Sequence, residues 1–135
     1  DFWRREIEAL GLKFRPSKLV LFRNEVKSRC GKIAEDNGLA YCPLDGRTYL
    51  SFAMWSKLEI EFEASGPSVR AYALAHEYGH HVTNNLGMMG PLFGLIVRQK
   101  DNITQNRITV VNELWADGLA GYFLVAMARD ERLNT

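Results

Sequence analysis

The 135-residue sequence has no long hydrophobic run and no concentration of charge of one sign. Its longest apolar runs, Leu92–Val97 and Leu119–Ala128, are far shorter than the roughly 20 residues that a membrane-spanning helix needs. Its 17 basic and 16 acidic residues are mixed along the chain, so the net charge of +1 gives no electrostatic basis for binding nucleic acid. A Gly-rich phosphate loop and a nucleophilic Ser or Cys motif are also missing. These absences argue against a membrane-spanning segment in this chain, a nucleic-acid partner and covalent catalysis by serine or cysteine.

Cysteine is scarce as well, since Cys30 and Cys42 are the only two and lie twelve positions apart. An even pair favours a disulfide in an exported protein, and two half-buried thiols are the alternative. Two cysteines are too few for a structural zinc site, which usually needs four nitrogen or sulfur ligands. We expect residues 1–135, which begin at Asp1, to be one domain of a longer extracytoplasmic protein. That protein would be secreted, periplasmic or anchored through a segment outside this sequence.

Hydrophobic patterning predicts short strands in the first half of the chain. The turn sequence Pro43–Gly46 separates the last two of them. The expected elements are a helix at Phe2–Leu10, a buried strand at Lys18–Arg23, strands at Leu39–Tyr41 and Arg47–Phe52, and a helix at Ala53–Glu63.

The second half of the chain is predicted to be helical. A helix is expected at Ser68–Asn85, because the preceding Gly-Pro pair suits a helix start. Residues 87–105 are expected to form a long connection, of the kind that often serves as a lid or binding loop. The last helix is expected at Arg107–Arg129, and its apolar character from Leu114 onward predicts a central core helix. Strands followed by helices indicate an α+β fold, with a small sheet packed against helices.

The sequence HEYGH at residues 76–80 matches the HExxH pattern of zinc peptidases. Residues four apart on a helix are rotated by about 40° and separated by about 6 Å, so His76 and His80 present their imidazoles to one ion. Glu77 lies about 100° round from His76, so its carboxylate reaches the open side of the metal instead of binding it. His81 points about 100° away from His80, and we do not expect it to be a ligand.

A catalytic zinc site needs a third protein ligand, which should be a carboxylate because no other histidine is available. Glu113 and Asp117 are four apart and are the only acids between residues 108 and 128, in a helix whose pattern otherwise predicts burial. Buried carboxylates are costly unless they are paired or bind a metal, which favours Glu113 as the third ligand. Asp117 fits a supporting role, in which it accepts the far N–H of a ligand histidine and fixes its tautomer. The alternative for Glu113 is an exposed helix residue, and the alternative for Asp117 is an exposed or capping acid.

Three separated motifs occur in order: a YCP-D-x-x-x-YL segment, an AHE-x-GHHV segment and an EL-x-AD segment. Their residues are Tyr41–Pro43 with Asp45 and Tyr49–Leu50, then Ala75–Val82, then Glu113–Leu114 with Ala116–Asp117. In these motifs the chain resembles the bacterial neutral zinc metallopeptidases over most of residues 18–125. The resemblance implies a zincin-like fold of the gluzincin type, with a small sheet packed on an active-site helix and a glutamate-bearing helix. It implies zinc at His76, His80 and Glu113, with Glu77 as the catalytic base.

The expected function is therefore hydrolysis of peptide bonds in a peptide or protein substrate, with zinc-activated water and Glu77 as general base. The resemblance implies that Arg47–Phe52 is the edge strand against which an extended peptide lies. The apolar segment Leu92–Val97 is expected either to wall a hydrophobic subsite or to pack into the core. The candidate donors to the oxyanion of the reaction are His81, Tyr49, Tyr78 and Arg107.

Two departures from the family pattern leave alternatives open. Gly118 follows Asp117 where the family has cysteine, and family members often have a longer C-terminal part. A non-catalytic zinc-bearing interaction domain is the alternative from another functional class, although a structural site has no use for a base at Glu77. Small HExxH proteases that cleave repressor proteins also place a glutamate on a later helix. They are an alternative within the same chemistry, but they lack the YCP segment.

Overall fold

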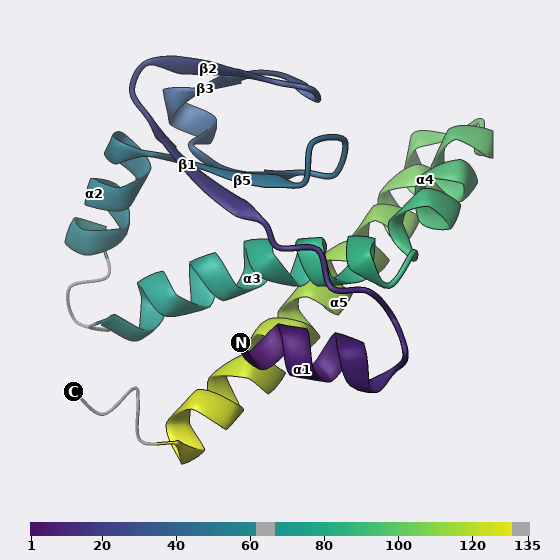
Figure 1. Cartoon of the computed structure of the whole chain (residues 1–135). Coiled ribbons are helices and arrows are strands. Elements are labelled where there is room, and N and C mark those ends of the chain that lie inside the picture. The colour runs from purple at the N-terminus through teal and green to yellow at the C-terminus, as the bar shows by residue number, and fades with distance from the viewer. Residues whose placement is uncertain (62–66, 131–135) are drawn as a thin grey trace.

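The protein combines small sheets with helices in a computed structural model that describes residues 1–61 and 67–130 (Figure 1). Strands dominate the first part and helices the second, which confirms the predicted α+β class. The end of the helix expected at Ala53–Glu63 lies outside the described residues. The elements are α1 Phe2–Ala9, β1 Lys18–Phe22, β2 Glu25–Ser28, β3 Gly31–Ala34, a short 3-10 turn Glu35–Asn37, β4 Leu39–Cys42, β5 Arg47–Ser51, α2 Phe52–Glu61, α3 Pro67–Asn85, α4 Met89–Arg98 and α5 Asn102–Arg129.

β5 is the central strand of a three-stranded sheet with the order β1-β5-β4. β1 pairs with it in parallel and β4 in antiparallel orientation, and residues 48–51 of β5 are buried. The expectation that Arg47–Phe52 is an edge strand is therefore wrong, because β1 and β4 take both of its edges. The expectation that Lys18–Arg23 is buried is also wrong. Leu19 and Leu21 share the solvent-facing side of β1 and are exposed.

Two strands that the sequence analysis did not predict, β2 and β3, form a separate antiparallel hairpin. Each strand has one large apolar residue, so neither shows a clear alternating pattern. These two residues, Val26 and Ile33, are directly paired and pack against a buried cluster that includes Cys42. A Cys30–Cys42 disulfide ties the hairpin to the end of β4, which confirms the predicted bridge.

α3 and α5 cross at very close range (Figure 1). The crossing point is Gly79, where an added Cβ would lie 2.7 Å from the carbonyl oxygen of Ala116. The buried residues of α5 form one stripe, Asn112, Ala116 and Ala120. The prediction of a central core helix is wrong, since several large apolar side chains of α5, including Leu114, are exposed. An apolar run that continues around all sides of a helix does not reveal which side is covered.

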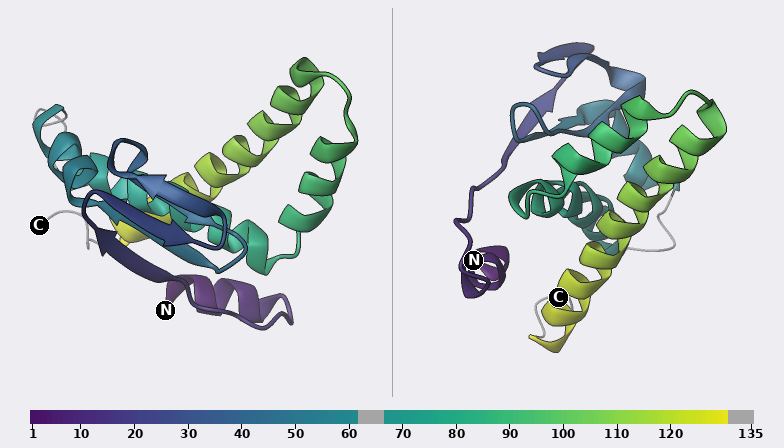
Figure 2. Two further views of the ribbon diagram at one scale, coloured as in Figure 1. Left: turned by 90° about the horizontal axis from the view of Figure 1, so that it is seen from above. Right: turned by 90° about the vertical axis from the view of Figure 1, so that its right-hand side faces the viewer.

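Residues 89–98 form helix α4, so the prediction of an irregular connection over residues 87–105 is also wrong. Gly87, with a φ of 75°, ends α3, and α4 begins within two residues of it. α5 begins at Asn102, earlier than expected, because the Asp101 side chain accepts a hydrogen bond from the backbone N–H of Thr104 and caps the helix. α4 folds back against α5, and the two project together away from the sheet (Figure 2).

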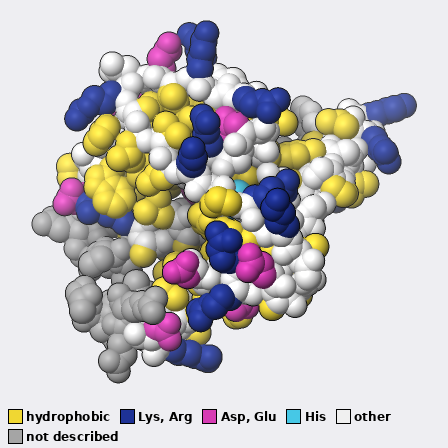
Figure 3. All heavy atoms as spheres, viewed as in Figure 1, with side chains coloured by type: hydrophobic (Ala, Val, Ile, Leu, Met, Phe, Trp, Pro, Cys, Tyr) yellow, Lys and Arg dark blue, Asp and Glu magenta, His cyan; other side chains and the backbone are white. Residues whose placement is uncertain are grey.

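α1 packs across α3 and α5 on the other side of the molecule (Figure 2). Its buried residues Trp3 and Ile7 contact Val82 of α3, as helical spacing predicts, whereas Leu10 just beyond the helix is exposed. Among the described helices, none has the length and hydropathy to cross a membrane. Basic and acidic side chains are intermixed over the face shown in Figure 3, in keeping with their distribution in the sequence.

Replacement of Gly79 by alanine tests the importance of the close crossing. The added methyl group meets the backbone of Ala116 and must push α5 away, so we expect a loss of about 1–3 kcal/mol in the free energy of unfolding. Gly118→Ala is the matched control, because a Cβ at that position of α5 has open space. The control should gain up to about 1 kcal/mol from helix propensity. Urea denaturation compares the two, and an equal gain in both variants would contradict a tight crossing.

Candidate metal centre

His76 and His80 lie one turn apart on α3, on the side that faces α5. Their ring centroids are 4.9 Å apart and the ring planes are perpendicular. His80 is buried and His76 is partly buried. The local reason is the helix itself, which begins at Pro67 and continues without interruption through both residues. The two imidazoles thus approach a common point, as their spacing predicts.

Glu113 of α5 completes a group of three possible ligands. Its Oε2 atom lies 3.2 Å from His76 Nε2 and 3.6 Å from His80 Nε2. Ligand atoms bound tetrahedrally at about 2.1 Å from a zinc ion lie roughly 3.4 Å from one another, so the observed spacing fits such an ion. One ligand atom from each of the three residues lies within 4.8 Å of the others. The structure therefore brings together a possible metal-binding triad.

The burial of Glu113 differs from the expectation. Its side chain is 49% exposed, and Glu113 is not part of the buried stripe of α5. The argument that a buried carboxylate requires a metal therefore does not apply to this residue. The convergence of its carboxylate with His76 and His80 is the observation that supports a ligand role.

Asp117 lies one turn further along α5, behind His76. His76 Nδ1 donates to Asp117 Oδ1 at 2.8 Å, which leaves Nε2 directed towards Glu113. Tyr72 Oη also donates to Asp117 Oδ1, at 2.5 Å. The hydrogen bond from Tyr72, followed by that from His76, lowers the pKa of Asp117 and keeps it ionised. The sequence analysis gave Tyr72 no role at the site, although its position four residues before His76 places both on one helical face.

Glu77 lies on the third side of the site, between α3 and β4. Burial raises the pKa of Glu77 to about 7, with Glu113 adding to the rise. The charge of His76 and a hydrogen bond from the backbone of Tyr41 act in the opposite direction. A carboxylate with a pKa near neutrality can both accept and release a proton under ordinary conditions.

A cleft of about 270 Å³ opens in front of the triad, between β4, α3, α4 and α5. Its polar wall includes the Glu77 carboxylate, and its apolar wall includes Met89 and Phe93 of α4. The lining residues are Leu39, Ala40, Tyr41, Pro43, Glu77, His80, Met89, Phe93, Asn112 and Glu113. The strand that lines the cleft is β4. The sequence analysis expected the edge strand at this place to be Arg47–Phe52, which contains β5.

None of the four candidate oxyanion donors lines this cleft in the described part of the chain. Tyr49 is buried in the sheet and donates to Asp45, and Tyr78 packs against the core cluster of α1. Arg107 is exposed on α5. His81 is buried, and its ring nitrogens contact Tyr41 Oη and the backbone oxygen of Arg15. His81 lies outside the triad, as expected.

Tyr41 is a cleft residue for which the sequence analysis gave no separate role. Its hydroxyl lies 3.0 Å from His81 Nδ1 and accepts a hydrogen bond from Asn84 at 2.9 Å. These contacts fix the end of β4 against the last turns of α3. The Tyr-Cys-Pro segment thus contributes one wall of the cleft and, through Cys42, the disulfide that holds that wall in place.

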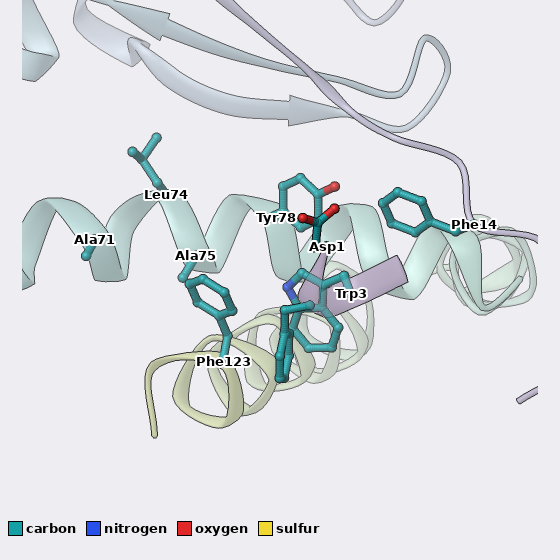
Figure 4. Close-up of a pocket in the computed structure, with 9 residues that line it drawn as sticks. Asp1, Trp3, Phe14, Ala71, Leu74, Ala75, Tyr78 and Phe123 are labelled. Atoms are coloured by element: carbon teal, nitrogen blue, oxygen red, sulfur yellow. The ribbon is translucent and has the colours of Figure 1, made fainter. Parts of the chain in front are cut away.

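A separate apolar cavity of about 400 Å³ lies between α1, α3 and α5 (Figure 4). Its wall includes Trp3, Phe123 and Tyr78. Tyr78 is two positions from both His76 and His80, and residues two apart on a helix point about 200° away from each other. The residues that line this cavity include none of the three triad residues, and Tyr78 points away from the face of α3 that carries them.

The raised pKa of Glu77 predicts a pH dependence of stability in the metal-free protein. The folded state binds the Glu77 proton more tightly than the unfolded state, so this contribution is complete below the ordinary pKa of 4.5 and is lost as the pH rises through about 7. We expect the free energy of unfolding of the parent protein to fall over this interval relative to Glu77→Gln, which has no such proton. Urea denaturation in the presence of a chelator measures both. Parallel pH profiles would contradict the buried, neutral carboxyl.

Comparison with known proteins identifies the family of the chain. The chain is 34% identical over 139 residues to "Uncharacterized protein YpfJ" of Escherichia coli strain K12, in a match that covers 100% of the chain and 47% of the relative. It is 41% identical over 71 residues to "Uncharacterized protein Rv2575" of Mycobacterium tuberculosis strain H37Rv, covering 52% of the chain and 24% of the relative. The chain thus spans about half the length of the E. coli relative, and no solved structure matches it. The family described as "Putative neutral zinc metallopeptidase" matches residues 1–135, so the chain belongs to that family.

Proposed function

We propose that the protein is a zinc-dependent metallopeptidase in which His76, His80 and Glu113 hold the metal. The observation that carries this proposal is the convergence of the three ligand atoms beside a cleft that Glu77 also lines. Two histidines and one carboxylate form the donor set of many catalytic zinc sites, and three protein ligands leave a fourth position open. The E. coli and mycobacterial relatives carry no functional name, so the proposal depends on the family and on this geometry.

Glu77 is the general base of the proposed reaction. A zinc ion at the triad would supply a Lewis acid for the scissile carbonyl and would make water a nucleophile near neutral pH. The Glu77 carboxylate accepts a proton from the attacking water and then transfers it to the amine that leaves. Its pKa of about 7, raised by burial, suits both steps. The backbone contact with Tyr41 orients this carboxylate towards the cleft.

The open edge of β4 is the proposed binding surface for the substrate backbone. β4 uses one edge to pair with β5, and its residues Leu39, Ala40 and Tyr41 line the cleft on the other side. An extended peptide that adds to this edge would gain main-chain hydrogen bonds and would run past Glu77 and His80. Such binding requires no particular side chains, so it fits a peptidase that acts on extended segments of peptides or proteins.

α4 supplies the proposed apolar subsite. Of the segment Leu92–Val97, Leu92 is buried, whereas Phe93 lines the cleft together with Met89. The sequence analysis left open whether this segment walls a subsite or packs into the core. Core packing applies to Leu92, and we propose that Phe93 walls the subsite. One side of the helix packs into the protein, and the other can contact an apolar substrate side chain.

The disulfide favours an oxidising compartment as the place where the proposed peptidase acts. Disulfides persist in oxidising compartments, and the Cys30–Cys42 bridge anchors the strand that lines the cleft. We therefore place the proposed peptidase outside the cytoplasm, where this bridge is stable.

Replacement of Glu77 by glutamine tests the general base. Turnover of a mixed peptide library, followed by mass spectrometry, should fall by about 10²–10⁴-fold, while the zinc content stays at that of the parent. Glu25→Gln, on the exposed face of the hairpin, should leave turnover unchanged. Equal cleavage by parent and Glu77→Gln would refute the mechanism. A zinc-loaded parent without turnover would instead favour the non-catalytic interaction domain.

Removal of the Asp117 carboxylate tests its role as a positioning residue for His76. Asp117→Ala deletes the acceptor at 2.8 Å from Nδ1, and we expect roughly 10–100-fold weaker zinc binding in competition with a chelator. His80→Ala, which lacks a ligand, should bind no zinc at the site. Asp130→Ala, at the exposed end of the same helix, is the control and should match the parent. Unchanged affinity in Asp117→Ala would show that the contact does not support the metal site.

A further inference from the structure

Asn112 occupies an unusual position on α5. It belongs to the buried stripe that faces α3, in line with Ala116 and Ala120 at four-residue spacing. The two alanines are fully buried and allow the helices to approach, but Asn112 places a polar amide in the same interface. A buried amide is costly unless its polar atoms find hydrogen-bond partners. Packing alone therefore does not explain why an amide occupies this position of the interface.

The missing partner lies on α3. His80 Nδ1 and Asn112 Oδ1 are both buried, and neither has a hydrogen bond of good geometry to another described residue. His80 and Asn112 line the same cleft. The residue that follows Asn112, Glu113, places its Oε2 atom 3.6 Å from Nε2 of the same His80 ring. One unsatisfied atom is a nitrogen that can carry a proton, and the other is an oxygen that can accept it.

We propose that Asn112 is a positioning residue whose Oδ1 accepts a hydrogen bond from His80 Nδ1–H. This contact fixes the neutral tautomer in which the lone pair is on Nε2, the nitrogen that lies 3.6 Å from Glu113 Oε2. The inference depends on the proposed function in one respect, because His80 is taken to be a metal ligand. A ligand histidine whose far nitrogen carries its proton needs an acceptor there, as His76 has in Asp117.

The two acceptors differ in charge. Asp117 is an ionised carboxylate and also receives the Tyr72 hydroxyl, whereas Asn112 is neutral. A second carboxylate in the buried stripe would be expensive, since it would add a negative charge beside Glu113 and Glu77. An amide supplies the acceptor without that charge. The site therefore supports its partly buried histidine, His76, with an ion and its buried histidine, His80, with a neutral group.

The tautomer of His80 in the metal-free protein is the direct test. Long-range nitrogen–proton NMR of the imidazoles, at a pH where they are neutral, distinguishes a proton on Nδ1 from one on Nε2. In the parent we expect His80 to carry its proton on Nδ1. A proton on Nε2 would overturn the proposal without any variant being made.

Variants at residue 112 supply the second readout, which is zinc affinity measured against a chelator. Asn112→Leu keeps the approximate shape but removes the acceptor, so we expect the tautomer to shift and zinc binding to weaken by roughly 10–100-fold. Asn112→Asp retains an acceptor and should keep the proton on Nδ1. Asn106→Leu replaces an exposed asparagine of the same helix and should change neither quantity. Parent-like values in Asn112→Leu would overturn the proposal.

These outcomes are separable from the peptidase test. A protein that shows the expected effects of Asn112 but cleaves no peptide retains the positioning role and loses the proposed function. The opposite result is also possible: the protein cleaves peptides, but Asn112→Leu changes neither the His80 tautomer nor the zinc affinity. In that case the proposed function stands and the positioning role of Asn112 is refuted. If Asn112→Leu does not fold, as circular dichroism would show, the tautomer of His80 in the parent protein still decides the question.

Discussion

The close crossing of α3 and α5 at Gly79 and Ala116 is the contact on which the rest of the site depends. The absence of a side chain at Gly79 lets the helix backbones approach until a single methyl group would no longer fit. At that separation the short carboxylate side chain of Glu113 reaches both histidines, and that of Asp117 reaches His76. A wider crossing would leave the histidines on one wall of a gap and the carboxylates on the other. The metal centre is thus a consequence of helix packing as much as of ligand chemistry.

Around this crossing, each side chain has a distinct electrostatic environment. Glu113 is half-exposed and remains available to an ion, whereas the burial of the Glu77 carboxyl raises its pKa to about 7. Asp117 stays ionised because two donors point at one of its oxygens. Burial raises the pKa of Glu77 and hydrogen bonding lowers that of Asp117, so these two carboxyl groups differ in their tendency to hold a proton. In the proposed mechanism this difference allows Glu77 to transfer protons while Asp117 orients a ligand.

The sheet contributes the opposite wall of the cleft. β4 pairs with β5 along one edge, is tied to the β2–β3 hairpin by the disulfide, and is fixed against α3 through Tyr41, His81 and Asn84. Its other edge faces the cleft, and we propose that an extended peptide binds there. β4 is therefore fixed by β5, by the disulfide and by α3, and only the edge proposed for substrate binding is left open. A strand held in this way keeps its backbone groups in position, which limits the ordering cost of binding a peptide.

The sequence by itself determined the features that depend on local periodicity and residue chemistry. The extent of α3 and the shared face of His76 and His80 follow from spacing along the chain. The even cysteine count favoured the Cys30–Cys42 disulfide that the structure contains. Glu113 and Asp117 were singled out because no other histidine was available and because burial was expected, and the exposure of Glu113 contradicts the second reason. Tertiary structure decided which strand is the edge, that residues 89–98 are helical, and which stripe of α5 is covered. It also placed Tyr72 and Asn112 beside the histidines. Strand order and helix crossing arise from contacts between residues far apart in sequence. An apolar run has the same sequence pattern whether or not another element covers it, so the pattern cannot identify the buried side. The site could therefore be named from its motif, but its geometry required the packed fold.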